Sequence, residues 1–159
     1  MIFLFAVHAC KNEMQKTTDP FHGMWKLDKF EVFESASGNW KPDTSRTGYN
    51  GFILYDGKGH MSVHLTPKGY KKYDTNRNID SLTKGDLMDL ALFYRSNFVY
   101  FADYIITDNT IEHHRHSATN PGDWGTVLTR TFEFRNDTLI LTPVEKIEDK
   151  ALRLRWIRM

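Results

Sequence analysis

From Phe21 to the C-terminus, the chain is a succession of short apolar or alternating runs separated by turn residues. Glycine, asparagine and aspartate stand between the runs, and these residues favour tight turns. Runs of this kind predict antiparallel strands that follow one another along the chain. The predicted strands are residues 25–34, 51–55, 60–65, 98–107, 110–118, 126–135, 138–141 and 151–158. About eight strands in sequential order make an up-and-down meander, which removes its exposed edges by closing into a barrel.

The two ends of this predicted sheet each carry a tryptophan. Gly23-Met24-Trp25 opens the first run, and Leu154-Arg155-Trp156-Ile157-Arg158 closes the last one. We interpret the two segments as neighbours in one closed sheet, because closure brings the first and last strands together. A closed barrel has an interior. A container for a small apolar or amphiphilic ligand is therefore the leading functional hypothesis.

One segment interrupts the strands. Thr83-Lys-Gly-Asp86 resembles a helix-initiating capping box. Apolar residues then recur at helical spacing, at Leu87, Leu90, Ala91 and Tyr94. We predict one short helix over residues 83–95, preceded by a surface loop over 67–80. Two placements follow: the loop and helix cover the barrel mouth as a lid, or the helix plugs one end or lies on the outer wall.

Composition and charge exclude some partners. The 159 residues suit one domain, and 26% charged with 40% hydrophobic residues are typical of a globular protein. Lys and Arg together number 21 and Asp and Glu 20, so the net charge of +1 provides no basic field for nucleic acid. Eleven Phe, seven Tyr and four Trp suit both strand formation and the lining of a pocket.

The first 20 residues differ from the rest. Residues 1–7 are apolar but too few to span a bilayer, which needs about 20. Val7-His8-Ala9-Cys10 resembles the bacterial lipoprotein processing box, in which a small residue precedes the cysteine that becomes acylated. We predict a signal and lipobox-like segment with a polar tether over 1–20, lipid attachment at Cys10, and a barrel domain over 21–159.

This N-terminal pattern predicts a location. A protein that is lipid-attached at Cys10 belongs to the bacterial cell envelope, as an outer membrane lipoprotein. Its membrane contact is then the N-terminal lipid anchor. The alternative is an apolar N-terminus that carries an incidental thiol.

Several short motifs follow one another in a fixed order. They are Gly23-x-Trp25, Gly51-Phe-Ile-Leu-Tyr55 with Gly59-His-Met61-Ser62, Tyr100-Phe101-x-x-Tyr104, His113-His114 with Pro121 and Trp124-Gly125, Arg130, and Leu154-x-Trp156-x-Arg158. In this order they resemble the bacterial lipocalin-like domain family, within the calycin group of small ligand-binding barrels. The resemblance runs from Gly23 to the end and implies an all-β, eight-stranded antiparallel barrel. Ala102 stands where the family usually has glycine.

The resemblance also implies how the barrel is closed. In calycins an arginine of the last strand packs over the tryptophan of the first motif. By position Arg158 is that arginine and Trp25 its partner, with Arg155 as the second choice. Stacking of a guanidinium on an indole is worth about 0.5 to 2 kcal/mol. We expect Trp25 and Arg158 to be structural residues.

Candidate ligand contacts come from strand alternation, because every second residue of a barrel strand faces the lumen. Arg130 shares a face with Leu128, Phe132 and Phe134. Arg130 either binds an anionic group of a ligand or extends past the rim to a surface carboxylate, since burial without a partner is too costly. Tyr104 is a second candidate contact through its hydroxyl, and ordinary packing is the alternative role.

Histidines supply the third candidate contact. His114 and His116 share one strand face, as His60 and His64 do on another strand, and such pairs are able to ligate a metal. Zinc needs at least three protein ligands near tetrahedral geometry, so we predict no metal and no cofactor. The resemblance places a family histidine on the 110–118 strand, and we carry it over to His114.

Two functional hypotheses result. In the first, the protein is a non-catalytic binder of a small hydrophobic or amphiphilic ligand in the lumen, contacted by Tyr104, His114 and Arg130. In the second, the same barrel is an isomerase or cyclase in which His114 performs acid–base chemistry. The sequence has no Ser-His-Asp order, nucleophile elbow or phosphate-binding glycine loop, which favours the binder. A protein that contacts other proteins through its rim is a third possibility, but it needs no inward arginine.

Overall fold

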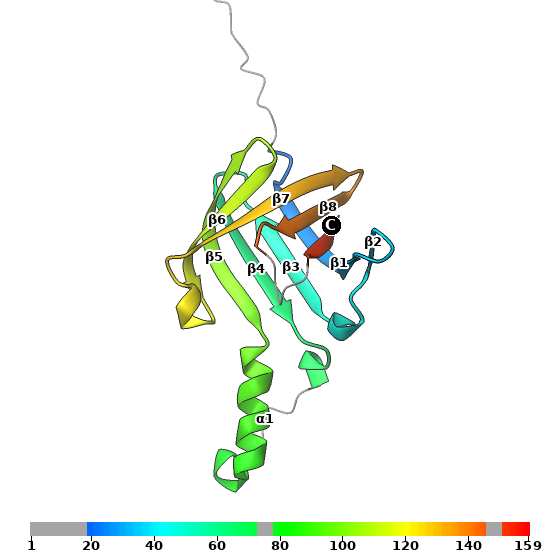
Figure 1. Ribbon diagram of the computed structural model, residues 1–159. Helices are drawn as coiled ribbons and strands as arrows, with labels where there is room; N and C mark the ends of the chain where they lie inside the picture. The colour runs from blue at the N-terminus through cyan, green and yellow to red at the C-terminus, as the bar shows by residue number, and fades with distance from the viewer. Residues whose placement is uncertain (1–18, 73–77, 146–150) are drawn as a thin grey trace, which may run out of the picture.

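The computed structural model describes residues 19–72, 78–145 and 151–159, which contain one antiparallel sheet of nine strands (Figure 1). The strands are β1 (Gly23–Glu34), β2 (Asn39–Pro42), β3 (Asn50–Tyr55), β4 (His60–Thr66), β5 (Phe98–Thr107), β6 (Thr110–Ala118), β7 (Val127–Arg135), β8 (Thr138–Pro143) and β9 (Leu152–Arg158). The α-helix described in these ranges is α1 (Lys84–Arg95). Short 3-10 turns are η1 (Thr44–Arg46), η2 (Tyr70–Lys72), η3 (Ile79–Ser81) and η4 (Pro121–Asp123).

The first and last strands close the sheet into a barrel. β1 pairs with β3 on one side and with β9 on the other, so eight of the nine described strands form a closed ring in sequential order. The predicted eight-stranded antiparallel barrel is confirmed. β2 is an addition that the sequence did not predict, and it pairs with the far half of β1. A strand of four residues is too short to show alternation.

The two ends of the barrel differ. At one end, here called the closed end, β1 begins, β9 finishes, and tight turns join β5 to β6 and β7 to β8. Asp108 and Asn136 have positive φ angles of 48° and 52° in those turns, a conformation that Asp and Asn tolerate. At the other end, here called the mouth, lie α1 and η4 (Figure 1).

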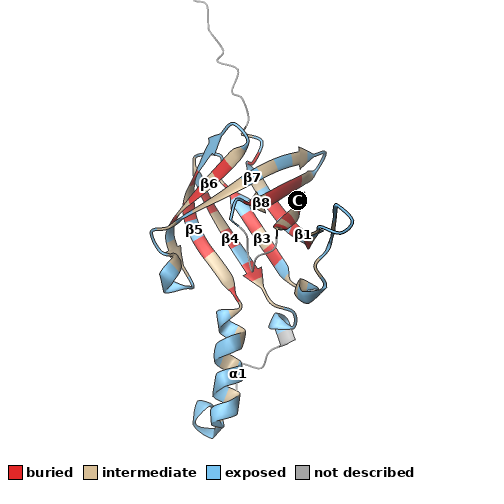
Figure 2. Ribbon diagram, in the orientation of Figure 1, coloured by how far each residue is buried: buried red, intermediate tan, exposed pale blue. Residues whose placement is uncertain are grey.

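Aromatic side chains fill the interior of the closed end. Phe21 is fully buried, and its ring centre lies 5.2 Å from Tyr55, 4.9 Å from Phe132 and 5.0 Å from Phe134. The Trp25 indole N–H donates a 2.7 Å hydrogen bond to the Phe21 carbonyl. Further buried residues lie along the barrel strands, as Figure 2 shows.

Arg158 and Trp25 lie together at the closed end. The guanidinium carbon of Arg158 is 4.0 Å from the Trp25 ring centre, which is the geometry that the sequence predicted. Arg155, the second choice, instead extends toward Asp28 and Glu31, with N–O distances of 3.6 and 3.8 Å.

The helix projects from the mouth. Thr83 accepts a hydrogen bond from the Asp86 backbone, and Asp86 accepts one from the Thr83 backbone, so the predicted capping box is present. No residue of α1 is buried, and Figure 1 shows the helix extending beyond the barrel. It therefore neither plugs the barrel nor lies on its wall. The predicted loop over 67–80 contains η2 and η3, and residues 73–77 lie outside the described residues.

The predicted signal and tether segment is almost entirely outside the described residues. Residues 1–18, which include Cys10, are not among them. In the part of the chain that the structure describes, no helix has the length and apolar character needed to cross a membrane.

Candidate functional site

His113 is the centre of a polar cluster inside the barrel. It is fully buried, with Nε2 3.0 Å from the Tyr55 hydroxyl and Nδ1 2.7 Å from the Tyr100 hydroxyl. Burial, followed by the charges of Arg130 and Arg115, lowers the pKa of His113 to about 3. The imidazole is therefore neutral near pH 7, with one nitrogen donating and the other accepting a hydrogen bond. We call Tyr55, Tyr100 and His113 the lumen cluster.

The two tyrosines of the lumen cluster stay protonated. Burial raises the pKa of Tyr55 and of Tyr100 above the usual value of 10.0. Each hydroxyl therefore keeps its proton while it faces the imidazole. Because both ring nitrogens are occupied and the side chain is buried, His113 is held as a structural centre and is not exposed to a substrate.

The structure corrects the predicted histidine contact. His114 does not face the lumen: its Nε2 lies 2.9 Å from a Glu112 carboxylate oxygen, and both side chains are partly exposed. A shift of one residue moves every side chain of a strand to the opposite face, so His113 faces inward instead. The sequence signal that was missed is the apolar Ile111, which is fully buried in the structure. Because strand residues alternate, an inward Ile111 puts the other odd-numbered residues of β6, including Arg115, on the inner face as well.

Arg130 lies on the inner face of β7. Its cross-strand partner is buried Ile111, and its neighbours Leu128 and Phe132 pack against the core. The side chain is partly buried, and its charge acts on the lumen cluster. No carboxylate of the described residues lies within 4.0 Å of Arg130. The sequence allows two placements for Arg130, toward the lumen or past the rim to a surface carboxylate. The structure has the first of them.

Tyr104 faces inward near the closed end. Its hydroxyl donates to the Asp19 carboxylate, and its ring centre is 5.0 Å from that of Tyr55. Burial and, second, the Asp19 contact raise the pKa of Tyr104. Its hydroxyl is thus already engaged. Of the three predicted ligand contacts, Tyr104 and Arg130 therefore face inward, and His114 lies on the outer wall.

Two of the three remaining histidines, His60 and His116, bind carboxylates outside the barrel. The His60 Nδ1 lies 2.7 Å from Asp56, and the His116 Nε2 lies 2.8 Å from Asp103. His64 does not join them and lines a cleft at the mouth. Across the described ranges, no three His, Cys, Asp or Glu side chains are placed to hold a metal ion.

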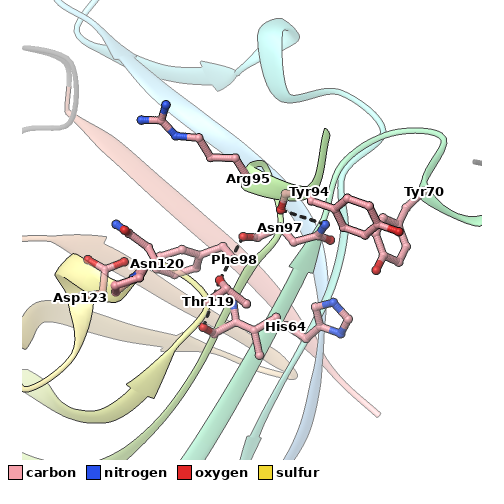
Figure 3. Close-up of a pocket in the computed structure, with 11 residues that line it drawn as sticks. His64, Tyr70, Tyr94, Arg95, Asn97, Phe98, Thr119, Asn120 and Asp123 are labelled. Carbon is pink, nitrogen blue, oxygen red and sulfur yellow. Dashed lines mark hydrogen bonds between the residues drawn. The ribbon is translucent and has the colours of Figure 1, made fainter. Parts of the chain in front are cut away.

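An open cleft of about 900 Å³ lies at the mouth, between the end of α1, the start of β5 and η4 (Figure 3). We call it the mouth cleft. Its aromatic and apolar lining comes from Tyr70, Tyr94, Phe98 and Val99. Its polar lining includes Asn97, Thr119, Asn120 and Asp123. None of the predicted ligand contacts lines this cleft, because sequence alternation does not show where a barrel is hollow.

Two side chains connect the mouth cleft with the lumen cluster. Phe98 packs edge-on against Tyr100, with ring centres 5.3 Å apart. Asp123 lies 3.0 Å from Arg115, whose guanidinium carbon is 5.8 Å from the Tyr100 ring centre. An occupant of the cleft therefore contacts residues that touch the buried cluster.

This geometry defines a small closed barrel with a cleft at its open end. The chain belongs to the lipocalin-like domain family, whose model matches residues 22–159. Among solved structures it is similar to a crystal structure of an asparagine-to-alanine mutant of the fluorescent protein UnaG, with 13% sequence identity and a TM-score of 0.40. That match covers 87% of this chain and 96% of the other. No curated protein matches the chain. The predicted family is confirmed, and its fold is typical of small-ligand binders.

Proposed function

We propose that this protein is a non-catalytic carrier that binds a small amphiphilic molecule in the mouth cleft. The observation that carries this proposal is the open cleft of about 900 Å³ at the end of a lipocalin-like barrel. A volume of that size lies within the usual range for small-molecule sites, about 300 to 1,000 Å³. The aromatic wall suits the apolar body of a ligand, and the polar wall suits its head group.

The packed closed end supports a ligand position near the mouth. Phe21, Trp25 and Tyr55 are fully buried there, and their aromatic rings occupy that end of the lumen. At the mouth, Phe98 is only partly buried and faces the cleft. The ligand therefore sits above the lumen cluster rather than deep in the barrel.

The alternative, an isomerase or cyclase that uses His114, has less support. His114 lies on the outer wall beside Glu112, outside the cleft. His113 is enclosed, with both nitrogens bonded to tyrosines. General acid–base catalysis requires a group within hydrogen-bond reach of the substrate, and neither histidine offers that reach.

A fluorescent probe tests the binding proposal. We expect 8-anilinonaphthalene-1-sulfonate to bind the full chain at one site, and Phe98→Ala to weaken binding about tenfold because the cleft loses its aromatic floor. Phe101→Ala is the matched control, since Phe101 is an exposed phenylalanine of the same strand. Equal effects of the two substitutions, or no binding by the native chain, contradict the proposal.

Native mass spectrometry extends the same test to the natural ligand. Protein purified from its own host is expected to carry a copurified small molecule, which Phe98→Ala reduces. Absence of any added mass in protein that binds the probe would show that the natural ligand leaves during purification, so the probe titration remains the deciding measurement.

We also propose that the protein is anchored in the bacterial cell envelope through a lipid on Cys10. The lipobox-like Val7-His8-Ala9-Cys10 supports this. Asp19 is bound by Tyr104 at the closed end, opposite the mouth cleft. Mass spectrometry of the membrane fraction should find acylated Cys10, lost in Cys10→Ser. An unmodified, full-length chain outside the membrane fraction overturns the anchor without affecting ligand binding.

A further inference from the structure

Asn97 stands in the wall of the mouth cleft, where the chain passes from α1 into β5 (Figure 3). Only 8% of the residue is exposed. Its side-chain Nδ2 donates to the Tyr94 carbonyl over 3.2 Å, and its own carbonyl accepts from Thr119 Oγ1 over 3.2 Å. The side-chain Oδ1, however, has no hydrogen-bond partner among the described residues.

The Tyr94 carbonyl fixes which amide atom is unpaired. If the Asn97 amide were turned over, Oδ1 would face that carbonyl, and two acceptors would meet without a proton between them. The buried atom without a partner is therefore an acceptor. Leaving a buried acceptor unpaired opposes folding, so such an atom in a cleft wall is a position where a ligand donor gains a full hydrogen bond.

Three other polar side chains of the cleft lining, those of Thr119, Asn120 and Asp123, have partners among the described residues. Thr119 Oγ1 donates to the Asn97 carbonyl, and Asn120 Oδ1 accepts from the Gly122 backbone over 3.3 Å. Asp123 contacts Arg115 over 3.0 Å. Asn97 Oδ1 thus differs from its neighbours in lacking any bond that the fold itself provides.

We infer that the ligand of the mouth cleft carries a hydroxyl or N–H group that donates a hydrogen bond to Asn97 Oδ1, while its apolar body lies against Phe98. This inference rests on the proposed function. Tyr94 and Arg95, which lie just before Asn97 in the cleft lining, are exposed. A ligand whose polar atom only accepts, such as an ether, leaves Oδ1 unpaired and binds more weakly.

A matched pair of probes tests the inference on the full-length protein. 2-Naphthol and 2-methoxynaphthalene share their ring system, but the hydroxyl donates a hydrogen bond and the methyl ether does not. By equilibrium dialysis, we expect the native protein to bind 2-naphthol about tenfold more tightly, because the ether leaves the buried Asn97 Oδ1 without a donor. In Asn97→Ala we expect the ratio of the two Kd values to fall to about two or less.

The ratio of the two Kd values separates loss of the Asn97 Oδ1 contact from general loosening of the cleft, because loosening weakens the binding of both probes alike. Asn120→Ser is the matched control, because Asn120 lines the same cleft, its Oδ1 is already bonded, and serine also caps a helical turn. Asn120→Ser should keep the ratio of the two Kd values that the native protein has. If Asn97→Ala does not fold, Asn97→Ser takes its place, because serine also lacks the amide oxygen; the ratio of the two Kd values is again expected to fall to about two or less.

Three results overturn the inference, and they are distinguishable. Equal binding of both probes by the native protein refutes the donor requirement while the carrier proposal stands. A native ratio that persists in Asn97→Ala assigns the donor preference to another group. Failure of the native protein to bind either probe refutes the inference, and the titration with 8-anilinonaphthalene-1-sulfonate then decides separately whether the proposed function stands.

Discussion

The guanidinium of Arg158 lies over the indole of Trp25, 4.0 Å from its ring centre, and joins the last strand of the barrel to the first. The same guanidinium donates to the carbonyls of Pro20 and His22 over 2.7 and 2.8 Å. Those two residues flank Phe21, which fills the closed end. The Arg158 side chain thus stabilises both the closure of the sheet and the segment that holds Phe21 inside the closed end.

Removal of the Arg158 guanidinium should lower the stability of the whole barrel. We expect Arg158→Ala to reduce the free energy of unfolding by about 2 kcal/mol, from the lost stacking and the two lost hydrogen bonds. Arg135→Ala is the control, because Arg135 is an exposed arginine paired with Glu133 on β7; its loss should cost less than about 1 kcal/mol. Urea denaturation measures both, and equal effects would contradict a closing role for Arg158.

The buried His113 predicts a specific loss of stability in acid. Its pKa is lowered from 6.5 to about 3 in the folded protein, so between these values the unfolded chain binds a proton that the folded chain does not. Its contribution is therefore complete above pH 6.5 and is lost as the pH falls toward 3, with a slope of at most about 1.4 kcal/mol per pH unit. Urea denaturation between pH 7.5 and 4.5 should show this slope.

Variants assign that slope to one histidine. His113→Phe should flatten the acid dependence, although it also lowers stability at pH 7.5 because Tyr55 and Tyr100 lose their partner. His114→Phe, on the outer face of the same strand, should leave the slope unchanged. A slope that survives in His113→Phe would mean that other groups cause the acid loss.

Arg130 should help to keep His113 uncharged. It is inward, and after burial its charge is the next cause that lowers the pKa of His113. We expect Arg130→Gln to reduce the loss of stability between pH 6.5 and 4.5, because the pKa of His113 in the folded protein then rises toward its value in the unfolded chain. Arg135→Gln on the same strand, measured by the same urea denaturation, should leave the acid dependence unchanged. An unchanged acid dependence in Arg130→Gln would show that this charge does not act on His113.

The helix α1 should unfold locally without affecting the barrel. None of its residues is buried, so its stability depends strongly on the capping box between Thr83 and Asp86. Thr83→Ala should cost the helix about 1 kcal/mol and accelerate hydrogen exchange of the 84–95 amides about fivefold. Exchange within β5 should not change. If hydrogen exchange in α1 is unchanged or slower in Thr83→Ala, packing rather than the capping box stabilises the helix.

The strands could be predicted because their signals are local. The bounds of β5 and β6 agree with the predicted 98–107 and 110–118, since Asp108 and Asn109 mark the turn between two clear runs. Ala102, where relatives usually have glycine, lies at a register shift between β5 and β6. The inward histidine was misplaced at His114 because it was carried over from the resemblance, whereas the alternation of Ile111, His113 and Arg115 is regular.

The sequence by itself determined the barrel, its family, the helix cap and the Trp25–Arg158 closure, because turns, strand alternation and end-to-end motifs are encoded in neighbouring residues. The tertiary structure alone decided that His113 rather than His114 is inside, that Tyr104 is bound by Asp19, and that Asn97 Oδ1 has no partner among the described residues around the cleft. These facts depend on cross-strand register and on which side chains meet at one end of the barrel. Register and cavity shape arise from packing among residues distant in sequence, which no local pattern specifies.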